Sequence, residues 1–229
     1  MSLIETEILK LQARARQVVT ILQRRLEIFA EAVEAEEWAR LREVRRYEAE
    51  ALAQDMRLDR RCARILALHQ PVAQDLRLVL AVLRMHFYLT EISERLEALG
   101  DRLSTHLPKL PPEKLRRVPL VTLVKNVQQL LDSCLEAFFQ ADSQRAKHIS
   151  EEDDAVDRSY DRCIQEIYAQ AMPPLSHAES QAWIELAIAV KTFEKIADYA
   201  IGIADASIYH TEGIYYWHRS QASRSDTNS

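Results

Sequence analysis

The chain has 229 residues, of which 48% are hydrophobic and 28% charged, and its net charge is −5. The length allows a sizeable core, and the acidic balance argues against a nucleic-acid partner, which would need a basic face. Only three residues are glycines, so few positions suit the left-handed backbone of tight hairpins, and we expect an all-α fold. No apolar run approaches the roughly 20 residues that span a bilayer, so we expect no membrane insertion.

Three helices are predicted in the first half, where apolar residues recur at steps of three and four. They cover residues 4–34, 36–68 and 71–105. His-Gln-Pro at residues 69–71 separates the second helix from the third, because proline lacks the amide hydrogen and restricts the residue before it.

A linker with three prolines, residues 106–117, follows the first half. The same periodicity then predicts helices over residues 118–140, 143–170 and 176–213. The small, polar residues 218–229 are predicted to form a disordered tail.

The two halves repeat one apolar pattern. A shift of 105 positions places Val19, Leu22 and Leu26 on Val124, Val127 and Leu131, and near the end of each half the shift is 104. We therefore expect two repeats, residues 1–105 and 118–217, joined by the linker. Long helices with short connections must run antiparallel, so the expected architecture is two tandem antiparallel three-helix bundles.

Four carboxylates of the second half are spaced for a common site. Asp153 and Asp157 are four residues apart on one predicted helix, and Glu194 and Asp198 on another, so each pair shares a helix face. If the two helices pack antiparallel, the pairs come level and form an all-oxygen metal site. The alternative is a solvated acidic face with salt bridges to Arg158, Arg162, Lys191 and Lys195.

The first half keeps only part of this set. Glu48 and Glu94 stand opposite Asp153 and Asp198, but Leu52 and Thr90 replace the other two acids. We expect metal to bind the first bundle weakly at best.

The sequence offers no catalytic or cofactor-binding residues, and we expect no enzyme. No histidine has glutamate three residues before it, as di-iron bundles require, and HExxH, CxxC and glycine-rich phosphate loops are absent. The cysteines are few, odd in number and far apart, which predicts buried, reduced thiols at Cys62, Cys134 and Cys163.

Three segments of the sequence, at residues 70–77, 193–204 and 153–157, resemble the PhoU family, the accessory regulators of bacterial phosphate-specific transport. QPVAQDLR at residues 70–77 is similar to the family's QPVAxDLR turn. FEKIADYAIGIA at residues 193–204 resembles ERIGDxxxNIA, and DDAVD at residues 153–157 resembles DxxVD. The resemblance covers residues 5–216, including the duplication and the helix lengths.

The resemblance implies a cytoplasmic negative regulator of the phosphate-starvation response that forms a homodimer. Its implied partners are the phosphate transporter's ATPase and a phosphate-sensing histidine kinase. It also implies metal, such as iron, manganese, magnesium or zinc, at the acidic faces, here Asp153, Asp157, Glu194 and Asp198, with Glu48 and Glu94 in the first bundle. Both a main phosphate regulator and a divergent paralogue fit these segments.

Two other functions stay open beside the regulator. One is a helical bundle whose role is to bind and handle metal, and the other is a helical scaffold unrelated to phosphate. A cluster of basic residues also allows two interpretations, a solvated flank or a docking surface for an acidic partner or phosphate: Arg57, Arg60, Arg61 and Arg64.

Overall fold

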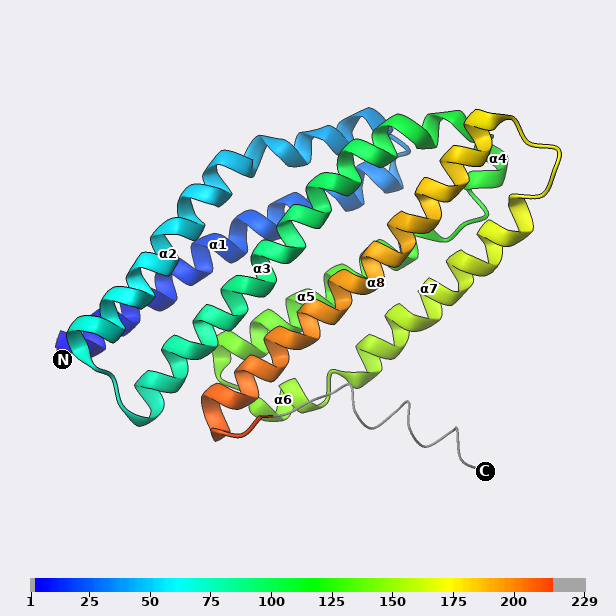
Figure 1. The fold of residues 1–229 in the computed structure, drawn as a ribbon. Helices are drawn as coiled ribbons and strands as arrows, with labels where there is room; N and C mark the ends of the chain where they lie inside the picture. Colours follow the sequence, from blue (N-terminus) through cyan, green and yellow to red (C-terminus); the bar gives the residue numbers. More distant parts are fainter. Residues whose placement is uncertain (1–2, 216–229) are drawn as a thin grey trace, which may run out of the picture.

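The computed structural model describes residues 3–215, and every regular element within them is a helix. Figure 1 shows two sets of long helices lying side by side, which confirms the all-α prediction and the paired bundles. The predicted tail, residues 218–229, lies outside the described residues. No helix within residues 3–215 is long and apolar enough to cross a bilayer.

The first bundle consists of α1 (Leu3–Glu34), η1 (Trp38–Tyr47) with α2 (Glu48–His69), and α3 (Ala73–His106). The single helix predicted over residues 36–68 is wrong at its start, because residues 38–47 form a 3-10 helix. The two buried residues of this segment, Leu41 and Val44, are three apart, which matches the three residues per turn of a 3-10 helix. Gly100 of α3 lets this segment approach, since an added Cβ there would lie 2.6 Å from Leu41 O.

The second bundle consists of α5 (Leu120–Gln140), α6 (Ser143–Lys147), α7 (Ser150–Gln170) and α8 (His177–Glu212). The helix predicted over residues 143–170 is interrupted at residues 148–149. Asp142 caps α6 by accepting from Arg145 N at 2.9 Å, so the chain starts a short helix before α7. A capping box of Ser176 and Glu179 starts α8.

The proline-rich linker is structured rather than open. It forms η2 (Leu107–Lys109) and α4 (Pro112–Leu115), and Leu107, Leu110 and Leu115 are buried. These leucines close the end of the bundles where α3 passes into the second half.

A single continuous apolar core joins the two bundles. Phe29 of α1 meets Phe193 of α8 edge to face, with ring centroids 5.3 Å apart. Gly202 of α8 lies against the ring of Tyr88 of α3, so the two helices approach closely. The three cysteines are buried and free, as predicted.

Two arginines of α3 hold the end of α8. Arg77 Nε donates to His210 O at 3.3 Å, and Arg84 donates to Tyr215 Oη at 2.9 Å. The Arg84 guanidinium also lies over the rings of Tyr209 and Tyr215, 4.5 and 4.7 Å from their centroids. The last described residues are therefore tied to the first bundle.

Candidate functional site

The acidic face of the second bundle lies between α7 and α8. Asp157 of α7 is brought close to Glu194 and Asp198 of α8. Burial raises the pKa of Asp157, and the nearby charges of Glu194, Asp154, Asp161 and Asp198 raise it further. The packing of the two helices therefore brings together three of the four carboxylates that the spacing places at a common site.

Two lysines neutralise the α8 side of this face. Lys191 Nζ lies 2.7 Å from Glu194 Oε2, and Lys195 Nζ lies 3.2 Å from Asp198 Oδ2. Each lysine is three residues before its acid, so both pairs form within one helix. The carboxylates are partly accessible, each side chain being 24% exposed. The pKa of Lys191 is raised because its ammonium group is hydrogen-bonded to Glu194.

Asp153 lies further along the same face, toward α5. It is near enough to the buried thiol of Cys134 to raise its pKa, together with Glu152 and Asp205, although burial is the larger cause. The sequence interpretation missed Glu152 and Asp205. Asp205 could have been found, because it follows Asp198 by seven residues, two turns along one face.

The donor set of this face is all oxygen, which suits magnesium, manganese, calcium or iron. Within residues 3–215, no three His, Cys, Asp or Glu side chains are grouped tightly enough to hold a metal ion. The ammonium groups of Lys191 and Lys195 hold Glu194 and Asp198 in ion pairs, so a metal would have to displace them. Metal at this face therefore stays a prediction.

In the first bundle, the two predicted acidic ligands lie at a cavity between α2 and α3. Glu48 and Glu94 line a cavity of about 150 Å³ together with Leu52 and Thr90, the two departures from the acidic pattern. Thr90 Oγ1 donates to Asp55 Oδ2 at 3.4 Å, and Leu52 is 61% exposed. The sequence interpretation missed three charged residues in this cavity: Arg25, Asp55 and Glu97.

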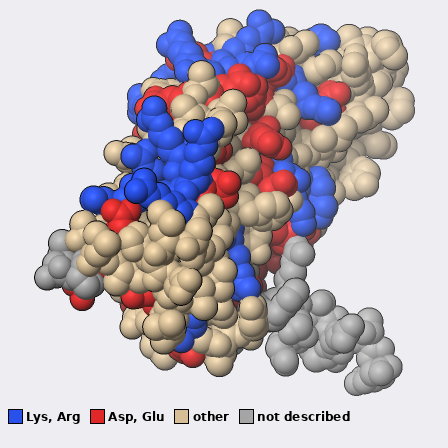
Figure 2. Space-filling model, turned by 60° about the vertical axis from the view of Figure 1, so that its left-hand side comes forward, with Lys and Arg blue, Asp and Glu red and all other residues tan. Residues whose placement is uncertain are grey.

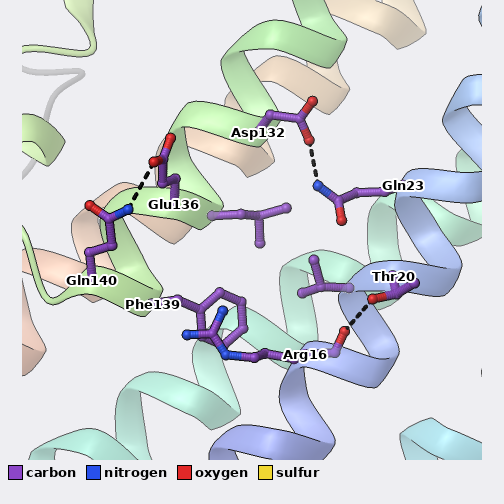
Figure 3. A pocket seen from close by; sticks show the side chains of 9 residues that line it. Arg16, Thr20, Gln23, Asp132, Glu136, Phe139 and Gln140 are labelled. Atoms are coloured by element: carbon purple, nitrogen blue, oxygen red, sulfur yellow. Dashed lines mark hydrogen bonds between the residues drawn. The ribbon is translucent and has the colours of Figure 1, made fainter.

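A larger cavity lies elsewhere, between α1 and α5 (Figure 3). Its volume is about 490 Å³. Gln23 Nε2 donates to Asp132 Oδ1 at 2.6 Å across it, and Arg16 lies over the Phe139 ring at 4.1 Å. Burial raises the pKa of Asp132. This groove runs along the junction of the two bundles and contains none of the predicted metal ligands.

The basic flank of α2 lies at the surface. Arg57, Arg60 and Arg64 are exposed, whereas Arg61 is tied to Glu7 of α1 at 2.6 Å. Figure 2 shows Lys and Arg side chains gathered on the side of the molecule where the chain begins. The flank is available to a partner, apart from Arg61.

Comparison with known proteins finds matches to PhoU proteins. Residues 120–207 match the PhoU domain model. The chain is 26% identical over 174 residues to the phosphate-specific transport system accessory protein PhoU homolog of Pseudomonas aeruginosa, covering 75% of this chain and 69% of that protein. It is 27% identical over 205 residues to the homolog of Deinococcus radiodurans, covering 87% of this chain and 92% of the relative. The chain is similar to PhoU proteins in sequence, and its second half matches the PhoU domain.

Solved PhoU structures share the fold over nearly the whole chain. The crystal structure of PhoU from P. aeruginosa superposes with a TM-score of 0.81 at 23% identity, covering 92% of this chain and 99% of that one. The phosphate transport system regulatory protein PhoU from Streptococcus pneumoniae gives 0.74 at 17% identity, covering 93% and 99%.

The PhoU domain match falls on the second bundle. The matched span, residues 120–207, contains Asp153, Asp157, Glu194 and Asp198. The first bundle, with Leu52 and Thr90 at two acidic positions, lies outside that span. The second half therefore stays nearer to the family pattern than the first.

Proposed function

We propose that this chain is a non-enzymatic, cytoplasmic regulator of phosphate transport and of the phosphate-starvation response. The observation that carries the proposal is the match to PhoU relatives along most of the chain, in sequence and in fold. Those relatives are named accessory proteins of the phosphate-specific transport system. An accessory protein acts through contacts, and the basic flank of α2 is one exposed surface for them.

The proposed partners are the ATPase of the phosphate transporter and a phosphate-sensing histidine kinase. A pull-down tests this with the immobilised chain, each partner from the same genome, and the ATPase of an unrelated transporter as control. We expect the chain to retain at least one of the two partners in phosphate-rich buffer and to release the control. Retention of neither would contradict the proposal.

A homodimer belongs to the same proposal, on the strength of the family resemblance. Sedimentation equilibrium over a tenfold concentration range measures it directly. We expect about twice the monomer mass of 26.5 kDa. A single species at the monomer mass throughout would remove the dimer from the proposal.

Metal bound at Asp153, Asp157, Glu194 and Asp198 is the second part of the proposal. The raised pKa of Asp157 supports it, because carboxylates crowded on one face are stabilised by a cation. Elemental analysis of the wild type against Glu194→Ala and Asp198→Ala tests it. We expect iron, manganese, magnesium or zinc in the wild type and a loss in both variants.

The same crowding favours a second candidate, a bundle whose role is to handle metal. The pull-down and the elemental analysis together separate the two functions. Metal-free protein that still retains its partner would remove the ion-handling function and leave the regulator. Metal-loaded protein that retains neither partner would favour ion handling.

A further inference from the structure

Arg25 of α1 is a buried charged side chain at the centre of the first bundle's acidic cavity. It is 1% exposed and borders the cavity of about 150 Å³ that Glu48 and Glu94 line. Its Nη1 donates to Ser93 Oγ, and its Nη2 lies 3.6 Å from Glu97 Oε2. Within residues 3–215, Nε and Nη2 have no hydrogen-bond partner. A charge buried this deeply is costly unless opposite charges surround it.

Four carboxylates supply that surrounding charge. Glu48 and Asp55 come from α2, and Glu94 and Glu97 from α3, all lining the same cavity. Burial lowers the pKa of Arg25, but Glu97, Glu48 and Asp55 oppose this, and guanidinium stays charged in proteins. Burial also raises the pKa of Asp55, which Arg25 and His86 counteract.

Two other basic side chains pair with carboxylates of this cavity and are not among the residues that line it. Arg45 Nε pairs with Glu97 Oε1 at 3.0 Å and is half exposed, and His86 Nδ1 lies 3.6 Å from Asp55 Oδ1. Of Arg25, Arg45 and His86, Arg25 alone is fully buried.

The second bundle shows what replaces this arrangement. In the register of the duplication, Arg25 corresponds to the buried Leu130 of α5. Three of the groups around Arg25 change with it, and each becomes an apolar or aromatic residue: Asp55 becomes Tyr160, Ser93 becomes Ala197 and Glu97 becomes Ile201. Arg25 and these three residues are therefore present together in one bundle and absent together from the other.

We propose that Arg25 is the built-in cation of the first bundle, and that it takes the place of a metal ion at the acidic face of Glu48 and Glu94. A guanidinium on a covalent stem cannot dissociate, so this face holds a permanent positive charge and binds no metal. The inference goes beyond the proposed function, because it concerns only the first bundle and holds whichever partner the protein has.

Manganese binding tests the proposal on the full-length chain. Glu194→Ala/Asp198→Ala removes the second face and serves as the parent, and free Mn²⁺ is followed by its aqueous paramagnetic resonance signal. The parent should leave Mn²⁺ free apart from weak surface binding. Adding Arg25→Leu, the residue of the second bundle, should create a site that binds at least tenfold more tightly than the parent. Glu48→Gln/Glu94→Gln should abolish the new site.

Two results would overturn the proposal. One is an Arg25→Leu protein that folds but binds Mn²⁺ no better than the parent. The other is a parent whose Mn²⁺ binding is already tight and is lost with Glu48→Gln/Glu94→Gln, since Arg25 would then share the face with a metal.

A companion variant covers the case in which Arg25→Leu does not fold. Arg25→Leu/Asp55→Asn/Glu97→Gln removes the same guanidinium together with two of the carboxylates it neutralises. If Arg25 serves to neutralise the surrounding carboxylates, the companion variant should fold in metal-free buffer and melt within a few degrees of the parent. A companion as unstable as Arg25→Leu would show that Arg25 serves packing, and the proposal would be wrong.

Discussion

Ionised Asp157 opposes folding at neutral pH, because burial, Glu194 and Asp198 raise its pKa in the folded protein. The folded state therefore holds the Asp157 proton more tightly than the unfolded state, so this residue's contribution to stability falls as pH rises through the window above 3.8. In EDTA at pH 7, Asp157→Asn should raise the melting temperature by about 1–2 °C, after allowance for solvent screening. The gain should vanish below the unfolded-state pKa of the carboxyl group.

Manganese should reverse the sign of that effect. If Asp157 is a metal ligand, saturating Mn²⁺ stabilises the wild type, and Asp157→Asn then melts below it. Asp154→Asn removes the same charge from a neighbouring position of α7 that is not among the predicted ligands. It should lose none of the Mn²⁺ stabilisation. A higher melting temperature for Asp157→Asn in both buffers would leave the solvated acidic face as the better interpretation.

At this scale the sequence predicted which acids of the second bundle share a helix face, and it offered Lys191 and Lys195 as their salt-bridge partners. Helical spacing sets which side chains lie on one face, and this places Asp157 near Asp198 once α7 and α8 pack. The burial of Arg25 could not be predicted from the apolar stripe of the first helix. An arginine is usually exposed, and only the packing shows that this one is buried. The structure confirms the salt bridges of Lys191 and Lys195, which pair with Glu194 and Asp198.

At the scale of the elements, α3 and α8 depend on a glycine for their close approach. A Cβ added at Gly202 would lie 2.5 Å from Cζ of Tyr88, so the ring would have to move. We expect Gly202→Ala to destabilise the protein by about 1–3 kcal/mol, measured by urea denaturation.

The control for Gly202 is the same substitution with the ring removed. In a Tyr88→Leu background, alanine meets no ring and has the better helix propensity, by about 1 kcal/mol. Gly202→Ala should therefore be neutral or stabilising there. If Gly202→Ala lowered the free energy of unfolding equally in both backgrounds, the destabilisation would come from the helix backbone and not from the contact with Tyr88.

The basic flank of α2 should contribute to partner binding through its charge. Arg57→Glu/Arg64→Glu reverses two exposed charges on one face of α2. If the proposed ATPase partner binds there, its affinity should fall about tenfold and depend less on salt. Lys109→Glu/Arg117→Glu makes the same change of charge in the linker and should bind as the wild type does. Surface plasmon resonance measures both, and equal weakening would indicate a general effect of net charge.

Helix existence was predictable and helix interruptions were not. Apolar periodicity located the long helices to within a few residues, since burial of one stripe drives them. The breaks at residues 47–48 and 148–149 leave the apolar pattern intact, because Leu41 and Val44, or Ala146 and Ile149, fit three-residue steps as well as an α-helix. The 3-10 helix η1 packs closely against Gly100 of α3, where an added Cβ would lie 2.6 Å from Leu41 O.

At the scale of the whole molecule, the bundles should unfold as one unit. The Phe29–Phe193 contact crosses from one half to the other in a continuous core. Phe29→Ala should lower the free energy of unfolding by about 3–5 kcal/mol while leaving a single transition. Fluorescence of Trp38 in the first half and Trp183 in the second can follow each bundle, using single-tryptophan variants.

Phe87→Ala is the matched control. Because Phe87 is 56% exposed, this substitution should lower the free energy of unfolding far less. Two separated transitions in the Phe29→Ala protein would show that the halves are independent domains. The duplication predicted two bundles but not this shared core, since an apolar residue in a repeat does not reveal whether it faces its own bundle or the other.

The contacts of Arg77 and Arg84 with the end of α8 determine where the chain can be shortened without loss of structure. A chain that stops after Tyr215 keeps the phenol that Arg84 binds and the carbonyl that Arg77 binds. A chain that stops before Tyr209 loses both aromatic rings over Arg84 and that carbonyl as well. Two expressed chains whose ends differ by only a few residues would therefore differ in whether α3 keeps its contacts with the end of α8.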